Sequence, residues 1–345
     1  MVTKTLEKFL KEKRGLSKKD IELFMSKDLS SLPLFNLKDL KKGAKIVKDA
    51  IKQNKKVAIY GDYDVDGTTA SSLLYLYLKD KIADIEVFQP DRFKHGYGLN
   101  KDLLTEIKNK GFDLIITVDL GITNCEEVDF VKNKLNMDII ITDHHHDIRD
   151  SIPKADAVIN PNRRDEKNES LKALAGVGVA YALTVATSKE LKIKIDTSLL
   201  QFVAIGTIAD LVPINYLNAI LVRNGLSQIE ESSKYPGIKV FFSESDFDTD
   251  VIPSTKVAFN IGPIINSAGR LFHAKKATDL LTATSFEKAE KLLLELKSNN
   301  SERRHVQEET LLEAKKQARK NIKNGDLINI IYNKRSEERR VGKEC

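Results

Sequence analysis

The sequence contains few cysteines and no long apolar run. Cys125 and Cys345 are its two cysteines among 345 residues, so there is neither a disulfide framework nor the paired spacing of a structural zinc site. No apolar segment approaches the roughly 18 to 20 residues of a transmembrane helix. The N-terminal stretch is polar and amphipathic, without the apolar region of a signal peptide. We therefore expect a cytoplasmic protein without membrane association.

The overall composition is that of an ordinary globular protein. Hydrophobic residues make up 41% and charged residues 31% of the chain, which is long enough for two domains. The formal net charge of +6 is compatible with a polyanionic partner. Lysine-rich surfaces are more often simply solvated, so the charge alone does not identify such a partner.

Short apolar runs separated by helix-like segments predict an α/β fold with a parallel Rossmann-like sheet. Because the runs are apolar throughout rather than alternating, both faces of the sheet should be covered. The predicted strands are "VAIY" (57–60), "DIEVF" (84–88), "LIITV" (114–118), "DIIIT" (138–142) and "AVIN" (157–160). From about residue 171 the pattern becomes helical, with helices expected at 171–191, 197–211 and 218–232.

These patterns suggest a division into an N-terminal helical segment and two α/β domains joined by a connector. A long, charged and periodic helix is expected at about 284–322, and "DLINIIYN" (326–333) should begin a strand of the second domain. The predicted parts are 1–50 (helical segment), 51–230 (sheet-containing domain), 231–325 (connector) and 326–334 (start of the second domain).

The last eleven residues do not resemble the rest of the chain. Residues 335–345, "RSEERRVGKEC", can be back-translated into a common sequencing-library adapter. We exclude them from the fold prediction and expect the natural protein to continue beyond about Lys334. A different codon series in the underlying nucleotides would contradict this interpretation.

Three aspartates at every second position form the stretch "GDYDVDG" (61–67). Asp62, Asp64, Asp66 and Gly67 fit the start of a calcium-binding EF-hand loop, whose twelfth residue should be glutamate. That position is Leu73, and a predicted strand rather than a helix precedes the loop. Calcium binding of this kind is therefore disfavoured, whereas ligands of open α/β sheets bind at the edge where such strands end.

Acidic and imidazole side chains also follow other predicted elements. Asp119 follows one strand, Asp143 and three histidines follow another, and Asp210 lies near a helix end. A single aspartate in such a place is usually a helix cap or a turn residue. Several of them converging on one edge favour a divalent-metal site, because carboxylates and imidazoles suit Mn²⁺ or Mg²⁺. So many ligands are typical of a two-ion centre that acts on phosphate esters.

Four segments resemble, in order and spacing, the motifs of the DHH phosphoesterase superfamily: "GDYDVDG", "VDLGI", "TDHHH" and "IADLVPI". "DRFKHGYGL" and "GPIINSAGR" are similar to segments of its RecJ branch, the single-strand-specific 5′-to-3′ exonucleases. The resemblance covers about residues 50–333. The resemblance implies that the second domain, which begins at residue 326, is similar to a DHHA1 domain.

The resemblance implies a role for each matching residue. One of two Mn²⁺ or Mg²⁺ ions would be held by Asp64 and Asp119, with Asp119 bridging to the other ion. The remaining ligands of the second ion would be Asp66, His144 and Asp210. His145 would face the scissile phosphate, and Asp143 would orient the histidine pair. Some superfamily members have a metal-binding histidine where this chain has Tyr60, which would weaken the first site unless Asp62 helps.

Substrate-binding residues are expected outside the metal ligands. Arg92 lies on a glycine-bearing loop, and Asn266, Ser267 and Arg270 lie in a predicted small-residue turn. The resemblance implies that they receive a terminal 5′-phosphate or the nearby backbone, although salt bridges and turn hydroxyls remain a structural alternative. The glycines of "ALAGVGVAYAL" are interpreted as close helix packing rather than a dinucleotide-binding loop, because no strand precedes them.

The resemblance implies a metal-dependent 5′-to-3′ exonuclease that degrades single-stranded DNA to mononucleotides in repair and recombination, and the acidic and histidine residues agree with such chemistry. The resemblance further implies a monomer that works with a helicase and single-strand-binding protein. A nanoRNase or cyclic-dinucleotide phosphodiesterase is an alternative with the same chemistry, disfavoured by the "GPIINSAGR" segment and the long connector. A catalytically silent DHH scaffold is a second alternative, disfavoured by the complete ligand set.

Overall fold

The computed structural model describes residues 4–29, 32, 36–92, 94–148, 151–243, 252–271, 274–323 and 331, with the backbone alone for residues 231, 232, 270, 271, 322 and 323. The strand predicted at 326–333 lies outside these residues except for Ile331, which belongs to no helix or strand. The adapter-like residues 335–345 also lie outside them. In the described part of the chain, no helix is both long and apolar enough to span a bilayer.

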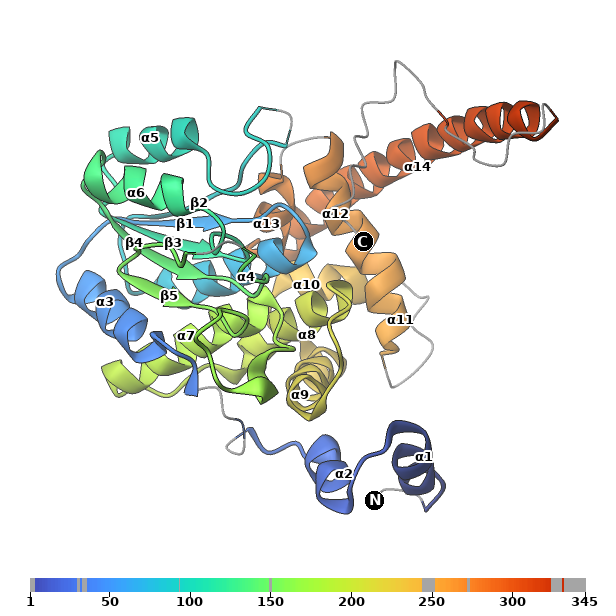
Figure 1. Ribbon diagram of the computed structural model, residues 1–345, viewed down its shortest axis with the longest axis horizontal. Helices are drawn as coiled ribbons and strands as arrows, with labels where there is room; N and C mark the ends of the chain where they lie inside the picture. The colour runs from blue at the N-terminus through green and yellow to red at the C-terminus, as the bar shows by residue number, and fades with distance from the viewer. Residues whose placement is uncertain are drawn as a thin grey trace.

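A five-stranded, fully parallel sheet forms the centre of the protein, in the order β2-β1-β3-β4-β5 (Figure 1). Its strands are β1 (Val57–Gly61), β2 (Ile85–Phe88), β3 (Leu114–Val118), β4 (Asp138–Thr142) and β5 (Ala157–Ile159). All five match the predicted strands to within one residue at each end, so the predicted α/β fold is confirmed.

Helices cover both faces of the sheet, as its continuously apolar strands require. Two helices pack on one face: α5 (Lys101–Asn109) and α6 (Cys125–Asn133). Three pack on the other: α3 (Leu40–Lys52), α4 (Val65–Leu78) and α7 (Gly176–Leu191). Behind α4 and α7 lies α8 (Leu200–Ala209), which is apolar on all sides because it is buried in a second helical layer.

The helices before the sheet divide into two groups by their contacts. α3 packs against α7 and β5, so it belongs with the sheet although the predicted boundary at residue 50 falls near its end. The preceding helices are α1 (Lys4–Arg14) and α2 (Lys18–Met25). They lie apart from the sheet, and α2 packs on α9 (Tyr216–Ser232) (Figure 1).

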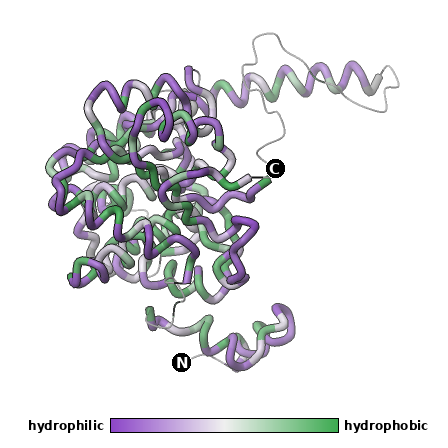
Figure 2. The backbone as a smooth tube through the Cα atoms, turned by 60° about the vertical axis from the view of Figure 1, so that its left-hand side comes forward, coloured by the Kyte–Doolittle hydropathy of each residue, from purple (hydrophilic) through white to green (hydrophobic). Residues whose placement is uncertain are grey.

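The connector consists of helices that pack against one another. It comprises α10 (Pro236–Phe242), α11 (Ser254–Lys256), the π-helical turn η5 (Val257–Ile261), α12 (Gly262–Leu271), α13 (Lys275–Leu281) and α14 (Phe286–Lys323). The first part of α14 packs on α10, α12 and α13. Its far end projects from the body and is mostly hydrophilic (Figures 1 and 2). The predicted long helix is thus present, nearly with the predicted bounds.

The "GPIINSAGR" segment was predicted as a turn, and this prediction is wrong, because it forms most of α12. Pro263 lies in the first turn of α12, where its missing N–H is not needed for a helical hydrogen bond. The wider turn of η5 directly precedes it. Gly269 lets α12 approach the loop after β1, since a Cβ there would lie 2.9 Å from the carbonyl oxygen of Tyr63.

Candidate metal centre

The predicted metal ligands meet at the carboxyl edge of the sheet. In the strand order β2-β1-β3-β4-β5, the connections run in opposite directions from β1 and β3, so the loops after these two strands flank a crevice. The loop after β1 carries Asp62, Asp64 and Asp66, and the loop after β3 carries Asp119. The sequence alone placed these side chains at strand ends, and the topology brings the strand ends together.

The start of α4 fixes the first three aspartates in different ways. Asp64 is the N-cap residue, and its Oδ1 accepts a 2.9 Å hydrogen bond from the Gly67 amide. Asp66 is fully buried, and its carboxylate accepts hydrogen bonds from the amides of Gly176 and Val177 at 2.5 and 2.9 Å. These amides form the N-terminus of α7, where the helix dipole favours a negative charge. The Asp66 carboxylate is thereby held in place across two elements.

Asp119 adopts a left-handed backbone conformation, with φ of 63°. Such a conformation is uncommon outside glycine, although aspartate tolerates it better than most residues, and strained residues cluster at functional sites. The Asp119 side chain is 1% exposed and packs against α7. A Cβ at Gly176 would come within 2.6 Å of its Oδ1, so only glycine fits there. The "AGVG" glycines therefore serve close packing, as expected, and the packed group is a predicted metal ligand.

The loop after β4 is organised around the buried carboxylate of Asp143. Its Oδ2 accepts a hydrogen bond from the Ile122 amide at 2.9 Å. Its Oδ1 accepts one from the His144 amide at 2.7 Å and lies 2.8 Å from Nδ1 of His145. Burial raises the pKa of Asp143, but these hydrogen bonds and the histidine charges outweigh that effect and leave the pKa below its ordinary value. Asp143 thus bonds to the backbone of the loop and to the ring of His145.

His144 lies among three carboxylates from three different elements. Its Nε2 is 3.1 Å from Oδ1 of Asp119 and 3.7 Å from Oδ2 of both Asp66 and Asp210. Its side chain is 12% exposed, whereas that of His145 is 44% exposed. Of the pair, His145 is therefore the more accessible to solvent.

Asp210 caps the C-terminal end of α8 and completes the cluster. Burial and the charges of Asp66 and Asp64 raise its pKa to about 8. Burial and neighbouring carboxylates likewise raise the pKa of Asp119 and Asp62 well above the ordinary value. Oδ1 of Asp119 and Oδ2 of Asp210 are buried and accept no hydrogen bond from any described residue. Buried like charges with free oxygens are stable only with protons or cations among them.

The geometry of the cluster fits divalent cations. Three groups have ligand atoms within 4.8 Å of one another: Asp62, Asp64 and Asp119; Asp66, His144 and Asp210; and Asp119, His144 and His145. Asp119 and His144 each occur in two of these groups, so the three groups join into one continuous cluster. The donors are carboxylate oxygens and imidazole nitrogens without a thiolate, a set that suits Mn²⁺ or Mg²⁺. Asp62, regarded in the sequence as an auxiliary ligand, lies within the cluster.

Tyr60 lies outside the cluster, on the other face of the sheet. It is fully buried in the core formed with α5 and α6. Its hydroxyl bonds to backbone groups of Gly98 and Asn100 at 3.2 Å each. Among the described residues, therefore, Tyr60 neither adds to nor occupies the metal centre.

Three residues near the histidines escaped the sequence analysis. Asn160 and Asn162, just after β5, donate side-chain hydrogen bonds to the carbonyl oxygens of His145 and His144 at 3.0 and 2.6 Å. Tyr97 places its hydroxyl 3.4 Å from Nε2 of His145, with the two rings edge to face. The signal in the sequence for the two asparagines was the triplet "NPN" (160–162) directly after β5. Because β5 lies beside β4, this triplet is close to the histidines that follow β4.

The predicted substrate-binding residues have different environments. Arg92 lies 5.9 Å from the centre of the ring of Tyr63, a residue between two of the clustered aspartates. Asn266 is half-buried in α12, and Arg270 lies in the same helix, with its side chain outside the described part. Ser267 is fully buried, and its hydroxyl donates to the carbonyl oxygens of Ile264 and Leu296. A substrate-binding role of the Ser267 side chain is therefore not supported.

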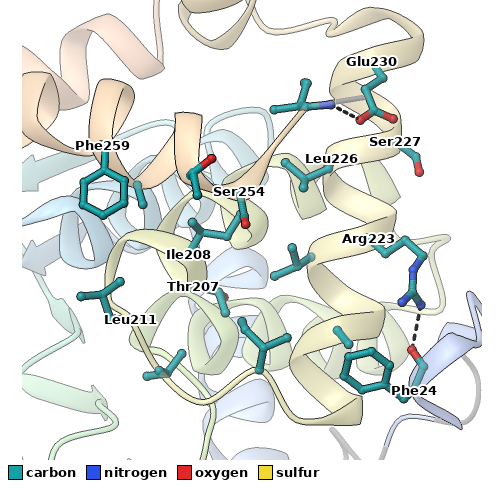
Figure 3. Close-up of a pocket in the computed structure, with 17 residues that line it drawn as sticks. Phe24, Thr207, Ile208, Leu211, Arg223, Leu226, Ser227, Glu230, Ser254 and Phe259 are labelled. Carbon is teal, nitrogen blue, oxygen red and sulfur yellow. Dashed lines mark hydrogen bonds between the residues drawn. The ribbon is translucent and has the colours of Figure 1, made fainter. Parts of the chain in front are cut away.

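A separate apolar cavity of about 640 Å³ lies beside the end of α8, between α9 and the segment from Ser254 to Phe259 (Figure 3). Among the residues that line it, Glu230 is the one acidic side chain, and it accepts a hydrogen bond from the Ile252 amide. Arg223 donates to the carbonyl oxygen of Phe24. With no carboxylate cluster in its lining, this cavity is not a second metal centre.

The sheet, the strand-end aspartates and the Asp-His-His loop define a DHH-type domain, and residues 56–207 match the DHH family, N-terminal domain. A crystal structure of exonuclease RecJ bound to manganese is 33% identical and has a TM-score of 0.73, covering 81% of this chain and 70% of that chain. A crystal structure of RecJ in complex with Mn²⁺ from Thermus thermophilus is 31% identical, with a TM-score of 0.74, covering 88% of this chain and 43% of that one. The chain belongs to the RecJ family of DHH proteins.

Curated relatives support the same family over most of the chain. The single-stranded-DNA-specific exonuclease RecJ of Bacillus subtilis (strain 168) is 37% identical over 296 residues, which are 85% of this chain and 37% of that protein. The protein of the same name from Escherichia coli (strain K12) is 33% identical over 295 residues, covering 82% of this chain and 51% of that protein. The chain thus spans about half of these relatives' length or less.

Proposed function

We propose that this chain is the nuclease part of a metal-dependent exonuclease that hydrolyses single-stranded DNA from the 5′ end to mononucleotides. The observation that carries the proposal is the convergence of carboxylates and imidazoles on the switch point of the sheet, where Asp119 and His144 each belong to two groups of ligand atoms. The family membership supports it, because the curated relatives are named single-stranded-DNA-specific exonucleases.

We propose a centre of two Mn²⁺ or Mg²⁺ ions. Asp64 and Asp119, with Asp62 in support, would hold one ion. Asp119 would bridge to a second ion held by the side chains of Asp66, His144 and Asp210. Such ions, when bound, supply a water of lowered pKa and stabilise negative charge at the phosphate. One related RecJ crystal structure is bound to manganese and another is in complex with Mg²⁺, in agreement with the donor set of this chain.

His145 is proposed to contact the scissile phosphate. Burial lowers the pKa of His145, but the hydrogen bond and charge of Asp143 raise it to about 9. In the metal-free protein the imidazole is therefore protonated at neutral pH. Because Nδ1 is bonded to Asp143, Nε2 is the nitrogen that can donate to a phosphate oxygen. Asp143 stays ionised and keeps the ring oriented, and Tyr97 lies at the same edge of the ring.

The 5′ end of the strand is proposed to bind between Arg92 and α12. Arg92 lies beside the loop of the clustered aspartates, and Gly269 brings α12 against the same loop from another side. Arg92, Asn266 and Arg270 would then provide charged and polar contacts to a terminal phosphate. The wider role in repair and recombination, the cooperation with a helicase and single-strand-binding protein, the monomeric state and the cytoplasmic location are parts of the same proposal.

Digestion of end-labelled DNA in Mn²⁺ tests this function. The substrates are single strands labelled at either end, with and without a 5′-phosphate, beside a blunt duplex. We expect mononucleotide release first from the 5′ end of single strands, a preference for the 5′-phosphate, and a loss of at least about a hundredfold in His145→Ala. The full-length gene product is assayed in parallel, because the chain spans only part of its relatives.

Other results would contradict the proposal in distinct ways. Release first from the 3′ end, or equal cutting of the duplex, would exclude a 5′-to-3′ single-strand exonuclease. Activity confined to dinucleotides or cyclic dinucleotides would favour the nanoRNase or cyclic-dinucleotide phosphodiesterase alternative. Metal binding without hydrolysis by the full-length protein would favour the silent scaffold.

A further inference from the structure

Tyr60 lies at the end of β1, and its side chain points away from the metal cluster. The ring is fully buried in the core with α5 and α6, on the opposite face of the sheet from α4. Two residues later, Asp62 lies in the metal cluster. The hydroxyl of Tyr60 is thus a buried polar group near the metal cluster. Neither metal binding nor apolar packing explains why a hydroxyl is present there.

The hydroxyl makes two hydrogen bonds to the backbone that follows β2. It donates to the carbonyl oxygen of Gly98 at 3.2 Å and accepts from the amide of Asn100 at 3.2 Å. A neutral phenol can donate and accept at once, whereas phenylalanine can do neither. Burial raises the pKa of Tyr60 far above its ordinary value, so the hydroxyl keeps its proton.

These bonds hold one end of the segment 94–99, here called the Tyr97 segment. Gly96 and Gly98 flank Tyr97 with φ of 75° and 84°, conformations that favour glycine and leave the free backbone with many alternatives. The segment therefore depends on outside contacts for a single conformation. Besides Tyr60, they include Asn124, which lies against Gly98, and Asn100, whose side chain donates to the His95 carbonyl at 3.3 Å. At the start of the segment, Lys94 and His95 bond to Asp91.

The Tyr97 segment also contacts His145, the residue proposed to bind the scissile phosphate. The hydroxyl of Tyr97 is 3.4 Å from Nε2 of His145, the nitrogen that remains after Nδ1 is bonded to Asp143. A chain of contacts therefore runs from Tyr60 through Gly98 and Tyr97 to His145. Loss of the Tyr60 hydroxyl would leave the buried carbonyl of Gly98 and the half-buried amide of Asn100 without this partner, and the segment would have to shift to satisfy them.

We infer that Tyr60 is a positioning residue for the substrate, whose hydroxyl fixes the Tyr97 segment so that Tyr97 stands beside His145 where the phosphate binds. This inference rests on the proposed function of His145. It gives Tyr60, which occupies the place of a metal-binding histidine in some DHH proteins, a role on the opposite side of the sheet.

The test compares Tyr60→Phe with Tyr77→Phe. Both variants remove one buried tyrosine hydroxyl, but that of Tyr77 bonds to Ser188, away from the Tyr97 segment. In Tyr60→Phe we expect faster amide hydrogen exchange at residues 98–100, unchanged Mn²⁺ affinity, and kcat/KM on single-stranded DNA lowered about tenfold. Tyr77→Phe should change none of these three.

A double-mutant cycle with Tyr97→Ala separates positioning from general damage. If Tyr60 acts through Tyr97, adding Tyr60→Phe to Tyr97→Ala should lower kcat/KM by less than twofold further. Additive effects, a loss of Mn²⁺ affinity in Tyr60→Phe, or unchanged exchange at residues 98–100 would each overturn the inference. The exchange readout needs no turnover, so an inactive wild-type protein would refute the proposed function while the anchoring of the segment is still measured.

Discussion

At the scale of single residues, the metal centre is a set of carboxylates that oppose one another until a cation binds. Asp62, Asp66, Asp119 and Asp210 all have raised pKa values, chiefly because they are buried. The charges of neighbouring aspartates add to the effect of burial in each case. The folded protein without metal therefore carries a free-energy cost at the site that the bound ions would remove.

Asp119→Asn should stabilise the metal-free protein while abolishing metal binding. The amide nearly preserves the shape of the side chain and removes a buried charge, so we expect the free energy of unfolding in EDTA to rise by about 1–3 kcal/mol. Calorimetric titration should show the loss of both Mn²⁺ ions, whereas Asp210→Asn should weaken mainly one. Two-ion stoichiometry retained in Asp119→Asn would disprove the bridging role.

Asp138→Asn is the matched control at the opposite edge of the sheet. Asp138 accepts a 2.8 Å hydrogen bond from Lys55 and also faces Lys132. Burial raises its pKa, but the two lysines lower it more, so the charged form is favoured. Removing this charge should destabilise the protein slightly, opposite in sign to Asp119→Asn.

The clustering of the proposed ligand residues could be predicted from the sequence, because strand-end aspartates and the histidine run follow a recognisable spacing. The surroundings of the predicted site residues could not be predicted from the sequence. Asp119 has a left-handed backbone and packs against α7, and Ser267 is buried against α14. Tyr97 escaped notice for the same reason. Tyr97 lies in the loop after β2, whereas His145 lies in the loop after β4, and only the fold brings the two loops together.

At the scale of elements, the strands were predictable and one helix was not. A strand in a parallel sheet buried on both faces must be apolar throughout, and that pattern is local. The helix α12 contains Gly262, Pro263 and Gly269, which locally favour a turn. Tertiary packing overrides them, because Gly269 permits the close approach to Tyr63 and Pro263 lies where a helix tolerates it.

Gly176→Ala should damage the metal centre although alanine is a better helix former. The new Cβ would come 2.6 Å from Oδ1 of Asp119 and 2.8 Å from its Cβ, so the start of α7 or Asp119 would have to move. We expect a stability loss of about 1–3 kcal/mol and a fall in Mn²⁺ affinity of about tenfold or more. Thermal unfolding and calorimetric titration measure the two effects.

Gly178→Ala, two positions further along α7, is the control for this substitution. Its Cβ would lie 2.9 Å from Cδ2 of Leu174, the end of a side chain that can rotate away. Mn²⁺ affinity should therefore be unchanged. Equal losses of affinity in both variants would show that α7 as a whole, rather than the contact with Asp119, determines metal binding.

At the scale of the whole molecule, metal and protons compete for one site that joins several distant parts of the chain. The loops after β1, β3 and β4 and the end of α8 each contribute proposed ligands, and α7 holds Asp66 by its N-terminus. A change in the charge of this site is therefore expected to affect the stability of the entire domain. The sequence indicated the proposed ligands but not this coupling, which depends on the burial of the carboxylates.

The metal-free protein should lose stability as the pH rises from about 4 to about 9. A group whose pKa is raised by folding contributes stability below its unfolded pKa, and that contribution is lost as the pH rises through the folded value. The ordinary carboxyl value is 3.8, and folding raises the pKa of Asp210 to about 8 and that of Asp62, Asp66 and Asp119 in the same direction. The pKa of His145 is raised from 6.5 to about 9, so its contribution to stability is also lost as the pH rises. Asp143 has the opposite sign, but its lowered pKa acts below pH 3.8.

Saturating Mn²⁺ should reverse this pH dependence, because the ligands must lose their protons to bind the ion and bound metal stabilises the folded state by mass action. Melting temperatures measured at pH 6 and pH 8.5, in EDTA and in Mn²⁺, test both signs in one experiment. We expect the melting temperature in EDTA to fall, and that in Mn²⁺ to rise, between pH 6 and pH 8.5. In Asp119→Asn, which lacks the carboxylate shared by the cluster, the melting temperature in EDTA should fall less, and its rise in Mn²⁺ should disappear. A melting temperature in EDTA that rises toward pH 8.5 would show that the clustered carboxylates are ionised in the folded protein without metal, contrary to the burial and mutual repulsion described for them.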